Sequence, residues 1–260
     1  MILNPHLSQI HLDTLFADFN SKHKVLANYA TDNSKNSNGR SERALYDNYI
    51  PQSLRLFRIR LRLAIGLKIG FNLDYALVKN EPTKETYIQI SKCNEAWFSF
   101  EAMKKFCDSF GWNSTNENKY KLFSSPELEN IALIDILLLT NSRIRADIYS
   151  KSKTRIDIKG YAGFLERNST SPGLKNALGD VRGKIELGEE DLTTTDLLAL
   201  AYGIRNTYVH EGVSALSGIE RYKNKICLLK ILYDFLILSQ LKVVIHAVEH
   251  QISAHHIQYP

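Results

Sequence analysis

The chain has 260 residues, enough for one large domain or two small ones, and it can bury a core without disulfides or structural metal ions. Its hydrophobic fraction of 44% and charged fraction of 23% exclude fibrous, collagen-like and wholly disordered proteins. The net charge of +5, from 33 Lys and Arg against 28 Asp and Glu, is compatible with a nucleic-acid partner but does not require one.

The cysteines and the first residues bear on where the protein works. The three cysteines are Cys93, Cys107 and Cys227. They form no CxxC pair, which argues against a secreted disulfide scaffold and against a cysteine-ligated zinc site. Residues 1–20 lack the pattern of a signal peptide, and charged side chains interrupt the most apolar stretch, residues 226–248. We therefore expect a cytoplasmic protein with no membrane partner.

Apolar residues at helical spacing predict three helices in the first half of the chain. The predicted helices are residues 5–29, 51–73 and 83–110, with a polar loop at residues 31–43 and a polar linker at residues 113–121. The second helix is ambiguous, because residues 58–63 alternate between Arg and apolar residues as a strand would. Leu54, Phe57 and Leu61 follow the helical period, which favours a helix.

Capping signals and periodicity predict four helices in the second half. The predicted helices are residues 125–149, 174–187, 193–211 and 217–252, with a loop at residues 169–173. Ser125 and Pro126 suit the start of the first of these helices. Thr193–Asp196 supplies capping residues for the third, and Ser217 with Glu220 makes a capping box before the last. The short loop between the last two helices predicts that they pack antiparallel.

These elements, without a convincing strand, predict an all-α helical bundle. The polar linker divides it into an N-terminal helical region at residues 1–120, to which no role is assigned, and a helical domain at residues 121–260. Arg55, Arg58 and Arg62 share one face of the predicted helix 51–73. That face could bind phosphates, or it could be a solvated face whose aliphatic stems cover apolar surface.

The segment from Tyr202 to Gly212 carries an Arg, an Asn and a His in a characteristic spacing. Asn206 directly follows Arg205, and four residues separate Arg205 from His210. This pattern resembles the signature of the HEPN family, in which an Arg, followed by a polar residue, precedes a His by four to six intervening positions. The expected architecture of residues 125–252 is also similar, with the signature at the end of the third of four helices.

The resemblance implies a ribonuclease that needs no metal ion or other cofactor and that usually acts as a homodimer, with its sites facing a shared cleft. Arg205 and His210 would be the catalytic pair, and Asn206 would support them. His suits the removal of a proton from the 2′-hydroxyl of RNA because its pKa lies near neutrality. Arg suits the stabilisation of the phosphate charge because its planar fork binds phosphate bidentately and stays charged.

The resemblance also bears on partners. If the chain is a toxin or defence effector, as the resemblance implies, an antitoxin or regulatory partner is expected besides the RNA substrate. In some of these toxins a Tyr two positions after the His is modified by a nucleotidyltransferase. Gly212 occupies that position here, which argues against that type of antitoxin. The alternative from another functional class is a catalytically inactive helical module that binds RNA, a nucleotide or a protein partner.

The helical wheel constrains the two proposed catalytic residues. Arg205 lies inside a broad apolar arc, between Ala201 and Leu198, so it either lines a polar cleft or forms a buried ion pair with another helix. His210 lies about 140° around an ideal helix from Arg205. The pair therefore converges only if the last turn loosens, if the Arg reaches around, or if a second subunit completes the site. Taken alone, His210 is typical of a surface His at a helix C-terminus.

Two further patterns have competing interpretations. Tyr202 and Tyr208 could stack on RNA bases, or they could be ordinary core aromatics, which the apolar arc favours. His246, Glu249 and His250 fit the H-x-x-E-H pattern of inverted zinc peptidases. That site needs a third protein ligand, for which only His255 and His256 remain downstream. A polar face of the last helix is the favoured interpretation.

Overall fold

The structure is a computed structural model that describes residues 6–35, 42–70, 81–112, 133–188, 190–209, 214 and 217–257. All regular secondary structure in these ranges is helical, which confirms the predicted all-α bundle. The helices are α1 (His6–Lys35), α2 (Glu42–Tyr49), α3 (Gln52–Gly66), α4 (Glu81–Asp108), α6 (Ile134–Ile144), the π-helical turn η1 (Arg145–Tyr149), α7 (Ser152–Arg167), α8 (Pro172–Leu187), α9 (Thr194–Val209) and α10 (Tyr222–Ala254). The alternating segment 58–63 lies within α3, as the helical period predicted.

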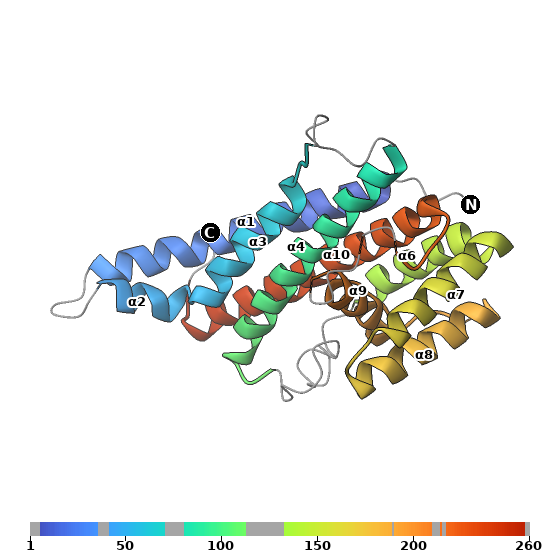
Figure 1. The fold of residues 1–260 in the computed structure, drawn as a ribbon. Helices are drawn as coiled ribbons and strands as arrows, with labels where there is room; N and C mark the ends of the chain where they lie inside the picture. Colours follow the sequence, from blue (N-terminus) through green and yellow to red (C-terminus); the bar gives the residue numbers. More distant parts are fainter. Residues whose placement is uncertain are drawn as a thin grey trace.

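Helix α10 runs through the middle of the bundle (Figure 1). It packs against α1 and α4 from the first half of the chain and against α6, α7 and α9 from the second. Most residues from Leu228 to Val248 are buried, and they lie on all sides of the helix, which is typical of a helix surrounded by others. Ion pairs join α10 to two of its neighbours: Lys230 to Glu85 of α4 at 3.0 Å, and Lys242 to Asp135 of α6 at 2.7 Å. No helix in the described ranges combines the length and apolarity needed to cross a membrane.

The buried apolar side chains of the two halves form one core. Phe57 of α3, Trp97 of α4 and Phe235 of α10 are all fully buried and belong to the same cluster. The predicted division between residues 1–120 and 121–260 falls outside the described residues, as do the linker at 113–121 and the helix start at Ser125. The division stays a prediction, and the helices described on either side of it pack together.

Part of the loop predicted at residues 31–43 is helical. Helix α1 continues to Lys35, and α2 begins at Glu42. The polar side chains that suggested a loop bond to their own helix: Thr31 Oγ1 donates to the carbonyl of Ala27 and Asn33 Nδ2 to that of Tyr29, at 2.8 and 2.9 Å. Side-chain bonds of this kind leave the backbone hydrogen bonds of a helix intact, so the polar composition did not end α1.

The second half departs from the prediction in three places. Helix α7 was not predicted at all. Helix α10 begins at Tyr222, without a side-chain cap, and not at Ser217 as predicted. Gly218 has a left-handed backbone conformation, with φ 85°, which a right-handed helix starting at Ser217 could not contain. The last two helices also do not pack antiparallel: Figure 1 shows α9 strongly foreshortened while α10 extends across the view, so the two helices cross.

Candidate functional site

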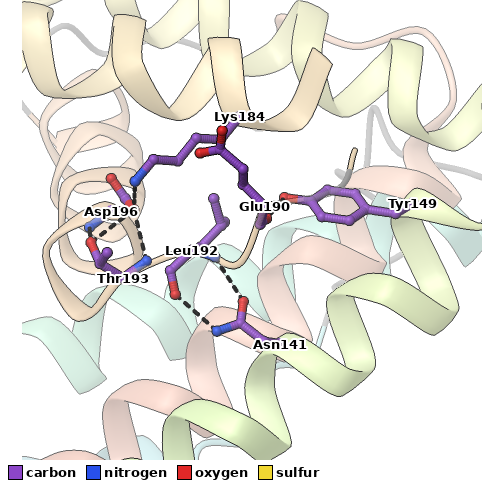
Figure 2. Close-up of polar contacts among 7 residues, drawn as sticks. All are labelled: Asn141, Tyr149, Lys184, Glu190, Leu192, Thr193 and Asp196. Atoms are coloured by element: carbon purple, nitrogen blue, oxygen red, sulfur yellow. Dashed lines mark hydrogen bonds and ion pairs between the residues drawn. The ribbon is translucent and has the colours of Figure 1, made fainter. Parts of the chain in front are cut away.

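A capping network fixes the start of α9, the helix that carries Arg205 and Asn206 (Figure 2). The Asp196 carboxylate accepts from the backbone N–H and the hydroxyl of Thr193, at 2.7 and 2.8 Å, and Thr193 Oγ1 accepts from the Asp196 N–H at 3.2 Å. This reciprocal pair is a capping box, as the sequence predicted. Lys184 of α8 donates to the same carboxylate at 2.7 Å and so joins the two helices.

The segment before α9 is attached to α6 and η1. Asn141 of α6 is 2% exposed; its Nδ2 donates to the Leu192 carbonyl and its Oδ1 accepts from the Leu192 N–H, both at 2.9 Å. The hydroxyl of Tyr149 donates to the Glu190 carbonyl at 3.2 Å. Figure 2 shows Asn141 facing both backbone groups of Leu192. The chain therefore enters α9 from a fixed position.

The middle of α9 packs against α4 and α8. The Tyr202 ring stacks on Trp97 of α4, with 5.2 Å between the ring centroids. Gly203 faces Leu178 of α8 so closely that an added Cβ would lie 3.3 Å from a methyl carbon. The core interpretation of Tyr202 is thereby confirmed, and α9 is held on both sides just before the motif.

Arg205 is buried at the interface between α9 and α4. It is 9% exposed, which confirms that it lies on the apolar arc. Its guanidinium carbon lies 5.6 Å from the centroid of Phe98, and Nη1 donates to Asn206 Oδ1 at 3.1 Å. Arg60 of α3, which pairs with Glu95, lies 5.3 Å from the same ring. Both guanidinium groups lie within the range at which the ring attracts a cation.

Asn206 lines an open pocket beside the motif. The pocket has a volume of about 390 Å³ and lies where α7 ends and α8 begins. Its lining residues are Leu165, Asn168, Ser169, Thr170, Leu174, Gly203, Asn206 and Thr207. The polar members are all neutral hydrogen-bonding groups, and such groups can hold the sugar hydroxyls or the base edge of an RNA strand.

The structure brings together two of the three predicted site residues. Arg205 and Asn206 are hydrogen-bonded neighbours, whereas His210 lies outside the described residues, directly after the end of α9 at Val209. Comparisons with protein-family models, with curated proteins and with solved structures find no match for this chain. A functional assignment therefore rests on the motif and on the geometry around it.

Sequence reasoning missed Lys225, which lies beside the end of α9. Lys225 is 2% exposed, donates to the Ser217 carbonyl at 2.9 Å and lies 4.4 Å from the centroid of the Tyr161 ring. It lines a narrow hollow together with Thr207 and Tyr208 of α9. Lys225 thus attaches the segment that follows the motif to the core. The signal in the sequence that could have indicated its burial is its position directly before Ile226, Cys227 and Leu228 at the start of α10.

Burial lowers the pKa of Lys225 to about 7, from 10.5. Between these pH values the unfolded chain binds a proton that the folded protein does not, so the free energy of unfolding rises with pH across this window. We expect that rise to total roughly 4 kcal/mol between pH 6 and 10 and to be absent in Lys225→Met. Urea denaturation of both proteins from pH 6 to 10 measures it, and equal pH profiles would contradict the burial of an ionisable amine.

The histidines of the H-x-x-E-H pattern pack on aromatic rings. The His246 ring lies 5.6 Å from Trp112, and the His250 ring lies 5.1 Å from Trp112 and 5.3 Å from Phe110. Glu249 pairs with Lys22 of α1 at 2.9 Å. In the described part of the chain no three His, Cys, Asp or Glu side chains are grouped to hold a metal ion.

Proposed function

We propose that the chain is a metal-independent endoribonuclease that cleaves single-stranded RNA. In this proposal Arg205 and His210 are the catalytic pair and Asn206 supports them. The observation that carries it is the Arg205-Asn206-x3-His210 motif, which resembles the HEPN signature. The helix that carries Arg205 is fixed by its capping box, by the stacking of Tyr202 on Trp97, and by the contact of Arg205 with Phe98.

The proposed reaction is a transfer of the phosphate ester within the RNA. His210 removes the proton of the 2′-hydroxyl, the 2′-oxygen forms a bond to phosphorus, and the bond from phosphorus to the 5′-oxygen breaks. The products are a 2′,3′-cyclic phosphate and a 5′-hydroxyl, which takes up the proton. Arg205 stabilises the charge that develops on the phosphate oxygens.

Two features of the described residues support the proposal. The Arg205 side chain is preorganised by Phe98 and Asn206, so little ordering is needed when phosphate binds. The pocket beside Asn206 offers neutral polar groups next to the cation.

We also propose that the protein acts as a homodimer in the cytoplasm, as a toxin or defence effector controlled by an antitoxin or another regulatory partner. The wheel places His210 about 140° from Arg205. A second subunit related by a two-fold axis would bring the His of one copy toward the Arg of the other.

The burial of Arg205 favours a second candidate. An Arg that is 9% exposed and held over Phe98 also joins α9 to α4, and that contact alone could explain it. In this case the protein is a helical module that binds RNA, a nucleotide or a protein without cleaving it.

One experiment separates the candidates. Purified protein is incubated with single-stranded RNA and with DNA of the same sequence, in the presence of EDTA. The ribonuclease proposal predicts cleavage of the RNA alone, because DNA lacks the attacking 2′-hydroxyl. If the folded protein leaves the RNA intact at micromolar concentration, the inactive module is correct.

A further inference from the structure

A second pocket lies on the N-terminal side of the bundle, far along the chain from the motif. It has a volume of about 530 Å³ and is open to solvent. Side chains of α1, α2 and α3 and of the turn between α2 and α3 line it. They are His23, Tyr46, Ile50, Arg55, Arg58, Ile59 and Arg62. The three arginines of the α3 face therefore converge on one pocket.

The pocket holds more positive charge than its neighbours neutralise. Arg55 pairs with Asp47 at 2.7 Å and lies 6.0 Å from the centroid of Tyr46. Arg58 and Arg62 form no ion pair with any acidic side chain of the described residues. Burial, and then the charge of Arg62, lowers the pKa of the Arg58 guanidinium. Two guanidinium groups that repel each other in a pocket favour an anion between them.

His23 adds a buried polar atom without a partner. It is 6% exposed, and its Nε2 has no hydrogen bond within the described chain; the same holds for Nε of Arg58. Buried polar atoms are satisfied in most folded proteins, so the residues that carry these two atoms, which both line the pocket, have hydrogen-bonding capacity that a bound ligand can use. Burial, and then Arg58 and Arg62, lowers the pKa of His23 to about 4, so its imidazole is neutral at pH 7 and can donate one hydrogen bond.

The remaining walls are apolar. Ile50 is fully buried at the base, and Ile59 is 56% exposed at the rim. The Tyr46 ring contributes a flat surface on which a planar group can stack. An open pocket between helices with one aromatic wall and convergent polar groups suits a small ligand, not a folded macromolecule.

We propose that this pocket binds a nucleoside phosphate, either free or as the terminal residue of an RNA strand. The phosphate contacts Arg58 and Arg62 and accepts a hydrogen bond from His23, while the base or ribose packs on Tyr46 and Ile59. The proposal does not depend on cleavage by Arg205 and His210, because it rests on different residues.

Calorimetric titration of the full chain tests the proposal. The probes are uridine 5′-monophosphate, uridine, inorganic phosphate, and a 2′-O-methyl trinucleotide with and without a 5′-phosphate, which the protein cannot cleave. We expect the monophosphate to bind at least about tenfold more tightly than uridine or phosphate alone. If the phosphorylated trinucleotide binds at least as tightly as the monophosphate, the source is an RNA end; if only the monophosphate binds, it is the free nucleotide.

Matched variants locate the binding. Arg58→Gln and Arg62→Gln should each weaken binding of the monophosphate by about tenfold or more, since each removes a charge-assisted contact. Lys24→Gln removes the same charge from an exposed position next to His23 and should leave binding unchanged. Arg62 is exposed, so its variant folds even if Arg58→Gln does not, and thermal melting checks both.

Three results would overturn the proposal. In the first, the monophosphate still binds with unchanged affinity after each of the two Arg substitutions. In the second, inorganic phosphate binds as tightly as the monophosphate. In the third, none of the probes binds. Arg205→Ala should bind the monophosphate normally. A protein that does not cleave RNA could therefore still bind the monophosphate, and a protein that does not bind the monophosphate could still cleave RNA.

Discussion

His210→Ala should reduce RNA cleavage by about 10²–10⁴-fold, the usual contribution of a general base, while the fold is kept. Arg205→Ala should reduce it by a comparable factor, because the loss of one stabilising donor costs on the order of a few kcal/mol in the barrier. Asn206→Ala should have a smaller effect, since it removes the hydrogen bond that orients Arg205 and one polar group of the pocket, but neither the base nor the cation. Initial rates on one fluorescent RNA, with EDTA present, give all three values.

Controls separate catalysis from folding. His11→Ala removes an exposed His from α1 and should cleave RNA as the unchanged protein does. Arg205→Ala also removes the contact with Phe98, so the free energy of unfolding must be measured with the rate. If activity falls only in proportion to unfolding, Arg205 is structural. Full activity in folded His210→Ala would exclude the proposed chemistry.

Asn141→Ala should lower the free energy of unfolding by roughly 2–4 kcal/mol. The substitution leaves the N–H and the carbonyl of Leu192 buried without their partners, and each such loss costs about 1–3 kcal/mol. Because this contact fixes the chain just before α9, RNA cleavage should fall as well. Urea denaturation of the purified variant measures the loss.

A second asparagine is the matched control. Asn168 is exposed, and its Nδ2 donates to the Phe164 carbonyl of its own helix at 2.8 Å. Asn168→Ala should change stability by no more than about 0.5 kcal/mol. Equal effects of Asn141→Ala and Asn168→Ala would show that the entry to α9 is not anchored as described.

The sequence predicted most helices because periodicity reports burial directly. The period of Leu54, Phe57 and Leu61 outweighed the strand-like alternation of residues 58–63, and all three residues are buried in α3. The burial of Arg205 followed from the same wheel. The Thr193–Asp196 capping box was visible because its partners are local in the sequence.

Features that depend on distant residues were not predictable in this way. Helix α7 buries Ile158, Tyr161 and Leu165 at helical spacing, but Gly160 and Gly163 weaken the helix signal between them. The capping box expected at Ser217 is absent because Gly218 fits its turn against the rings of Tyr161 and Phe164, where a Cβ would lie within 3.0 Å of both. No local pattern reports that contact.

The site was predictable in part. The motif identified Arg205 and Asn206, and the structure adds the partner that the sequence did not indicate, Phe98 of α4. The pocket of His23, Arg58 and Arg62 joins helices from different segments, so the sequence predicted the Arg face but not the buried His beneath it.

The chemical ends of the cleaved RNA test the central claim most directly. The protein is incubated with a short RNA in EDTA, and the products are identified by mass spectrometry. Attack by the 2′-oxygen predicts a 2′,3′-cyclic phosphate on one fragment and a 5′-hydroxyl on the other, with neither product formed by His210→Ala. Fragments that carry a 3′-hydroxyl and a 5′-phosphate, or intact RNA, would contradict it.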